Sequence, residues 1–224
     1  MGSVSDSVYL AAAEYIDSDH ATIEAFVPTV VTLDMSAAEK ARRLYVATRE
    51  MRYDPDLDFD DPETYRASSV LLSRAGYCVG KAALFAALCR AAGIPARVAF
   101  GDVTNHLASE RLREKMGTNY FHWHGFTEVL LGDRWVKASP TFNSTLCSRF
   151  GVAPLDFDGR SDALLQAYDQ GGRTFMKYEV LHGAFHDVPA KFLTAEMARR
   201  YPNMKASRSR SAGGMENEVP LATA

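Results

Sequence analysis

The spacing of apolar and polar positions predicts helices in the first half of the chain. Apolar residues recur at helical spacing in five segments, 8–16, 19–27, 37–51, 63–74 and 78–92. Ser36 and Glu39 form a capping box at the start of the third segment. The last segment is apolar nearly all round, with only Lys81 and Arg90 charged, so we expect it to be a buried central helix that ends at Gly93.

Strands are predicted in the second half of the chain. Residues 96–103 suit a strand, and the β-rich runs 121–131 and 134–139 flank Gly132-Asp133, as in a hairpin with a two-residue turn. Further elements are expected at 107–116 (helix), 143–150 (helix), 174–181 (strand) and 189–200 (helix), with His182 and His186 in loops. Helices followed by strands favour an α+β fold.

The composition is that of an ordinary globular protein. The chain has 224 residues, 47% of them hydrophobic and 24% charged, which suits a single domain over 1–202. Residues 203–224 are polar and rich in Gly and Ser, and we expect a disordered tail there. The net charge of −3 gives no basis for binding nucleic acid. Without a long apolar run or a signal-peptide pattern, we expect no membrane association and a cytoplasmic location.

Cys78 is the strongest candidate for a chemical role. It stands at the start of the predicted central helix, where the helix dipole and unpaired N–H groups favour a thiolate. Tyr77 lies in the turn into the helix, and Lys81 is expected to add positive charge over its first turn. The alternative is a buried packing residue, which is how we interpret Cys89 and Cys147.

The hairpin register supplies a partner for the thiol. In that register Phe126 lies opposite Ser139, and His124 lies opposite Thr141. His124 and Ser139 are then diagonal neighbours, roughly 5–7 Å apart at Cβ, which permits a hydrogen bond. Glu128 lies roughly 13 Å from His124 along the strand, too far to orient it. The register therefore predicts Ser139 or Thr141 as the residue that orients the histidine.

Two segments resemble a known family. GYCVGKAALFAALCRAAGIPAR (76–97) resembles the segment around the nucleophile of transglutaminase-like proteins, and HGFTEVLLGDRWVKASPTFN (124–143) is similar to the two strand motifs that follow it. The resemblance covers about 70–143. It implies a transglutaminase/papain-like core, in which a Cys-bearing helix packs on an antiparallel sheet. Cys78 would be the nucleophile, His124 the general base, and the third member would lie on the next strand.

The sequence departs from the family at that third member. Ser139 stands where the family has Asp, and Phe126 where it has Trp, a change that would keep an aromatic lid. A hydroxyl can hold the imidazole but carries no charge to stabilise the imidazolium. Three explanations remain open: a specialised enzyme that uses Ser139, an acid from elsewhere, or a lost activity. The candidate acids are Asp102, Asp156 and Asp158.

The resemblance implies acyl transfer at an amide through a thioester, either as a peptidase or amidase or as a transamidating enzyme. Such chemistry needs no cofactor, and its substrate would be a peptide, a protein or a small amide. An inactive domain that binds a peptide or protein is the alternative. A less favoured alternative is a metal site of His122 and His124 with His106 or Cys78. The residues expected to support the site are Tyr77, Lys81, His122, Phe126, Thr141 and Asn143.

Overall fold

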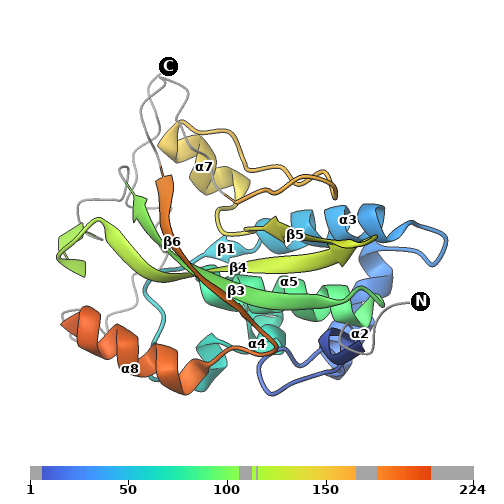
Figure 1. The fold of residues 1–224 in the computed structure, drawn as a ribbon, viewed down its shortest axis with the longest axis horizontal. Coiled ribbons are helices and arrows are strands. Elements are labelled where there is room, and N and C mark those ends of the chain that lie inside the picture. Colours follow the sequence, from blue (N-terminus) through green and yellow to red (C-terminus); the bar gives the residue numbers. More distant parts are fainter. Residues whose placement is uncertain (1–6, 106–112, 115, 165–175, 203–224) are drawn as a thin grey trace.

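A computed structural model describes residues 7–105, 113–114, 116–164 and 176–202 (Figure 1). Its centre is the helix α5 (Cys78–Ala91), which packs on one side against a four-stranded antiparallel sheet and on the other against helices. The strand order is β5-β4-β3-β6. The strands are β3 (Ala96–Asn105), β4 (Tyr120–Leu131), β5 (Arg134–Ala138) and β6 (Met176–Phe185). This architecture confirms the predicted α+β class.

The helices that cover the other side of α5 come from the first part of the chain. They are α2 (Ala21–Val30), α3 (Ala37–Arg49) and α4 (Ala67–Ser73). At the start of α3 the Ser36 hydroxyl accepts a hydrogen bond from the backbone N–H of Glu39 at 3.2 Å, half of the predicted capping box. A parallel pair of short strands, β1 (Arg52–Tyr53) and β2 (Ala75–Gly76), leads into α5.

Two predicted helices are shorter than expected. Over 8–16 only a 3-10 turn, η1 (Val8–Leu10), forms, because the Asp187 carboxylate takes the backbone N–H groups of Tyr15 and Ile16. The predicted helix 63–74 is divided into the 3-10 turn η2 (Pro62–Thr64) and α4. The division arises because the N–H of Ala67 donates to the carbonyl of Tyr15 instead of continuing a helix.

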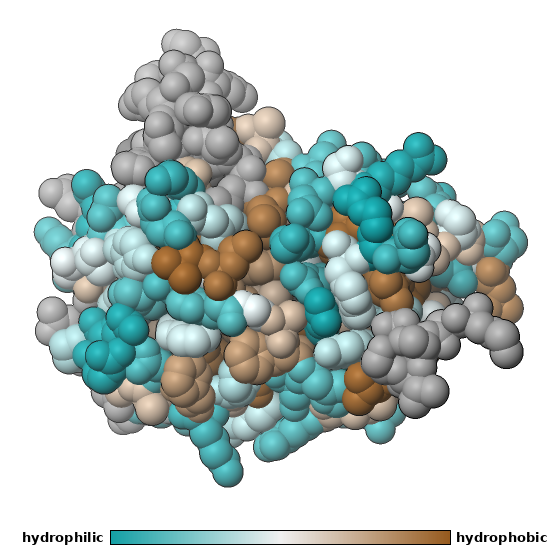
Figure 2. All heavy atoms as spheres, in the orientation of Figure 1, coloured by the Kyte–Doolittle hydropathy of each residue, from teal (hydrophilic) through white to brown (hydrophobic). Residues whose placement is uncertain are grey.

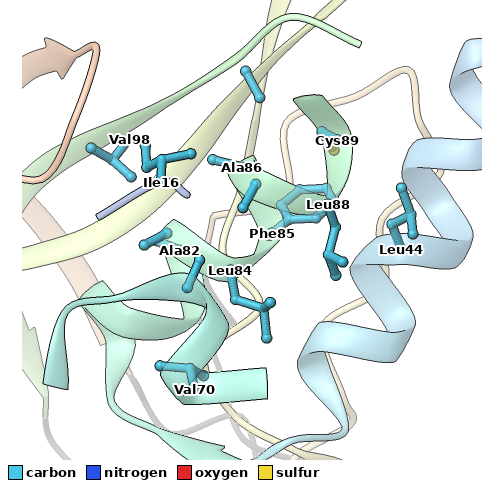
Figure 3. Packing of buried hydrophobic residues seen from close by; sticks show 14 of the residues in the cluster. Ile16, Leu44, Val70, Ala82, Leu84, Phe85, Ala86, Leu88, Cys89 and Val98 are labelled. Atoms are coloured by element: carbon cyan, nitrogen blue, oxygen red, sulfur yellow. The ribbon is translucent and has the colours of Figure 1, made fainter. Parts of the chain in front are cut away.

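The prediction of a buried central helix is confirmed. Every residue of α5 from Cys78 to Arg90 is buried. Figure 3 shows Leu44 of α3 beside Leu88, and Val98 of β3 on the sheet side of α5. A helix buried on all sides must sit in a fixed position, since cores are packed as densely as organic crystals. Its first residue is therefore fixed relative to the sheet.

The β4–β5 hairpin has the predicted register. Leu131 pairs with Arg134, and the ladder extends to Thr127 and Ala138. At Gly125 strand β4 lies directly on the first turn of α5, because a Cβ there would come within 2.8 Å of Val79 Cα. The hairpin therefore brings the residues near Gly125 close to the start of α5.

Strand β6 begins two residues later and ends four residues later than expected, so His182 lies in a strand and the loop prediction was wrong for it. Val180 and Leu181 of this edge strand are exposed, and Figure 2 shows hydrophobic surface over its middle. Helices α7 (Ser144–Phe150) and α8 (Ala190–Arg200) agree with the predictions. The predicted helix 107–116 and the tail 203–224 lie largely or wholly outside the described residues. Within the described ranges, no helix combines the length and hydropathy needed to cross a bilayer.

Candidate functional site

Cys78 opens onto a pocket of about 60 Å³ between α5, β4 and α8. The thiol is 9% exposed, and His124 lines the same pocket from β4. Tyr201, directly after α8, contributes to the wall, as does Met197 within the helix. The structure thus brings together the two residues that the sequence singled out as nucleophile and base, at the N-terminal end of a fixed helix.

The predicted lowering of the thiol pKa is wrong in this structure. Burial raises the pKa of Cys78 to about 11, although the backbone N–H groups of Gly125, Val79 and Cys78 itself favour the thiolate and oppose that rise. The prediction counted the helix terminus but not the desolvation that comes with a site beneath a strand. The resting thiol is therefore neutral at pH 7.

His124 is also uncharged at rest. Its Nε2 lies 3.4 Å from Ser139 Oγ, and Ser139 Oγ lies 2.9 Å from Thr141 Oγ1. Burial lowers the pKa of His124 to about 4, with no opposing charge to offset it. The hairpin register thus correctly placed Ser139 next to His124, with Thr141 behind it. The first hydrogen bond is long, as is common in sites without a bound substrate.

None of the three candidate acids forms a described hydrogen bond or ion pair with His124. Asp156 binds Arg49 at 3.0 Å and is almost fully exposed. Asp158 accepts hydrogen bonds from the backbone N–H groups of residues 160 and 161 at the surface. Asp102 is buried but is bound to other partners. Glu128 pairs with Arg97 at 2.7 Å, in agreement with its predicted distance from the histidine.

Asp102 instead forms a network with two other histidines. Its carboxylate binds His122 Nδ1 at 2.9 Å and His182 Nε2 at 2.7 Å, and it accepts the N–H of Trp123 at 3.0 Å. Hydrogen bonds from these groups keep the pKa of Asp102 low despite its burial. Arg200 donates to His122 Nε2 at 3.0 Å, so Nδ1 is the ring nitrogen that donates to Asp102.

A β-bulge creates this network. The register of β3 against β4 shifts between Gly101 and Val103, at Asp102, and Trp123 on the facing strand has a φ of 58°. The predicted metal site assumed simple alternation along β4, which would place the His122 and His124 side chains on one face of the strand. The two imidazoles in fact have separate partners, and the described residues contain no group of three His, Cys, Asp or Glu suited to a metal. His106 lies outside the described residues.

The expected supporting residues have mixed outcomes. Lys81 was expected to act on the thiol, but its fully buried ammonium donates to the carbonyls of Arg49, Met51 and Thr141 at 2.7–2.8 Å. Its contacts therefore join α5 to the loop that carries Thr141. Asn143 Oδ1 accepts the N–H of Tyr53, a pocket residue.

The aromatic residues near the site also have mixed outcomes. Tyr77 lines the pocket, but Phe126 is buried in the sheet and does not form the expected lid. Tyr178 of β6 was missed by the sequence reasoning. Its ring lies edge-on to His124 at 5.8 Å, and its buried hydroxyl has no hydrogen-bond partner in the described part of the chain. No motif marks it, because β6 is distant in sequence from the hairpin.

Comparisons with known proteins identify the class. Residues 24–140 match the family model of the transglutaminase-like superfamily, and the chain belongs to that superfamily. The chain is also similar to the crystal structure of a putative cysteine protease from Cytophaga hutchinsonii, with 17% identity and a TM-score of 0.48. That alignment covers 82% of this chain and 57% of the other, so this chain spans little more than half of that protein's length. No curated protein matches the sequence.

Proposed function

We propose that this protein is a cysteine-dependent enzyme that transfers the acyl group of an amide through a thioester on Cys78. The observation that carries the proposal is the shared pocket of Cys78 and His124 at the start of α5. The substrate would be a peptide, a protein or a small amide, and the reaction needs no cofactor. All three cysteines are free, which suits a reducing compartment such as the cytoplasm.

The first step starts from a neutral pair. His124 takes the thiol proton while the sulfur attacks the amide carbonyl, because neither group is charged at pH 7. The C–N bond then breaks, the proton passes from the imidazolium to the leaving amine, and the acyl group remains on sulfur as a thioester. Water or a second amine attacks the thioester, gives its proton to His124, and releases the acid or a new amide with the free thiol.

Ser139 would hold the histidine during these steps. If Nε2–H donates to Ser139 Oγ, the Ser139 hydroxyl can donate in turn to Thr141 Oγ1. That arrangement leaves Nδ1 of His124 as the basic nitrogen. Backbone N–H groups at the start of α5, such as that of Val79, would stabilise the oxyanion of the tetrahedral intermediate.

Alkylation and acylation of Cys78 test the proposal. Iodoacetamide should modify Cys78 before Cys89 and Cys147, since only Cys78 lines the pocket, and the rate should rise without a plateau up to about pH 10. An amide substrate should give a covalent acyl adduct, detected by intact mass, that is absent in Cys78→Ala and slow in His124→Ala. A wild-type protein that binds amides but never forms the adduct would show an inactive binding domain instead.

A further inference from the structure

The pocket beside the thiol also restricts the acyl group. We infer, on the basis of the proposed function, that the site takes a neutral, compact apolar acyl side chain, of the kind found in leucine, in preference to a charged or bicyclic one. The inference concerns the walls of the pocket and not the reacting atoms. It can therefore fail while the thiol chemistry holds, and it can hold where turnover is absent.

The walls of the pocket are mainly apolar and aromatic. Phe59 and Tyr77 meet edge to face with ring centroids 5.0 Å apart, and Phe121, Met197 and Tyr201 also line the pocket. Among the described residues that line the pocket, none is Lys, Arg, Asp or Glu. A charged side chain that entered would lose its water without gaining a counter-ion, which is costly.

His122 and Tyr201 at the pocket are already bonded within the protein, whereas the buried Tyr77 hydroxyl has no hydrogen-bond partner among the described residues. Both ring nitrogens of His122 are taken, by Asp102 and Arg200. The Tyr201 hydroxyl accepts the N–H of His122 at 2.7 Å and donates to the carbonyl of Tyr120 at 3.2 Å. A charged substrate side chain that bound His122 or Tyr201 would have to break these bonds, whereas an apolar one would leave them intact.

The wall that α8 provides is held in place. Glu196 accepts from Trp123 Nε1 at 3.3 Å and binds Arg200 at 2.7 Å, while Thr194 donates to the carbonyl of Phe59 at 2.9 Å. The hydrogen bonds to Trp123 and Phe59 tie α8, which Figure 1 labels, to β4 and to the loop that carries Phe59. The pocket is partly open to solvent, and its volume of about 60 Å³ is well below the roughly 150 Å³ of an apolar cavity that binds benzene. Size therefore favours a compact aliphatic group over a bicyclic ring.

Alkylating reagents of matched reactivity measure this preference at the thiol. N-substituted chloroacetamides bearing isobutyl, indolylethyl, carboxyethyl or aminoethyl groups would react with Cys78, each rate being divided by its rate with glutathione. We expect the isobutyl reagent to be at least about tenfold faster than either charged reagent and faster than the indolylethyl one. Equal normalised rates, or a faster charged reagent, would overturn the inference.

A charge placed in the wall provides the matched comparison. Met197→Glu puts a carboxylate in the pocket, while Ala195→Glu adds the same charge on the exposed part of the same helix. Met197→Glu should shift the preference toward the aminoethyl reagent by about tenfold, and Ala195→Glu should leave it unchanged. Identical behaviour of the two variants would show that Met197 does not face the occupant.

Turnover separates this inference from the proposed function. Amides of one fluorogenic amine with leucyl, tryptophanyl, glutamyl or lysyl acyl groups should be cleaved in the order set by the reagents. If cleavage is the same in Cys78→Ala, the proposed function fails while the reagent series still tests the pocket. If cleavage depends on Cys78 but is fastest for the glutamyl or lysyl amide, the function holds and the pocket inference is refuted.

Discussion

Restoring a carboxylate at position 139 should charge the histidine of the site. Ser139 is 3% exposed and its hydroxyl lies 3.4 Å from His124 Nε2, so the carboxylate of Ser139→Asp would lie within hydrogen-bond range of the imidazole. In the natural protein burial alone shifts the pKa of the His124 ring. The substitution therefore adds the one interaction that the site lacks relative to the aspartate of the family pattern.

The size of the effect follows from the structure. Burial lowers the pKa of His124 from 6.5 to about 4, and at about 1.4 kcal/mol per pKa unit this disfavours the imidazolium by about 3 kcal/mol. A carboxylate about 4 Å away contributes about 4 kcal/mol in the opposite sense at an effective dielectric constant of 20. The two effects are of similar size, so the pKa of His124 in Ser139→Asp should return to about 6 or higher.

The assay is an NMR titration of the His124 ring between pH 3.5 and 8.5, together with the pH dependence of Cys78 alkylation. An imidazolium beside the thiol favours thiolate, so alkylation at pH 6 should be about tenfold faster in Ser139→Asp than in the natural protein. Ser139→Asn is the control, since it has nearly the same shape and no charge. If the two variants titrate alike, Ser139 does not act electrostatically on His124, and an acid from another part of the chain would have to be sought.

Three further changes test other parts of the site. The folded-state pKa of His124 lies below its unfolded value of 6.5, so its neutral form contributes stability that is complete above pH 6.5 and lost toward pH 4. Urea unfolding should show this acid destabilisation in the natural protein, and His124→Leu should lack up to about 3 kcal/mol of it. Lys81→Met leaves three buried carbonyls without their donor and should lower the unfolding free energy by about 2–5 kcal/mol, against almost no change for the exposed Lys191→Met. Gly125→Ala forces a Cβ within 2.8 Å of Val79 Cα, so the free energy of unfolding should fall by about 1–3 kcal/mol and the rate of Cys78 alkylation should change. An unaltered denaturation midpoint would mean that β4 does not press on α5.

The central motif was predictable from sequence because its determinants are local. An apolar helix that starts at Cys78 and ends before Gly93 specifies burial on all sides, and a two-residue turn at Gly132 fixes which residues of the hairpin face each other. His124 and Ser139 follow from that register alone. Local patterns of this kind survive folding because tertiary packing reinforces them.

The network around Asp102 could not be predicted in the same way. It depends on a β-bulge, which interrupts the alternation of side chains between the two faces of a strand. It also depends on His182, which lies in a strand about 80 residues away. One signal was present: an aspartate near the end of the apolar strand run 96–103 must find partners if the strand is buried. The desolvation of Cys78 was likewise invisible, because it comes from β4 packing over the start of α5 and not from neighbours in the sequence.

The lowered pKa of His124 and the raised pKa of Cys78 are two consequences of the same burial. In a buried site a preformed thiolate and imidazolium would each lose hydration, and with Ser139 in place of a carboxylate nothing would offset that loss for the imidazolium. A neutral pair avoids this cost at rest and develops charge only as the sulfur attacks, when backbone N–H groups can meet the oxyanion. Under the inference drawn above, the mainly apolar lining of the adjoining pocket would select against charged acyl groups. A hydroxyl at position 139 is thus consistent with an apolar substrate and with a nucleophile that is activated only when that substrate is bound.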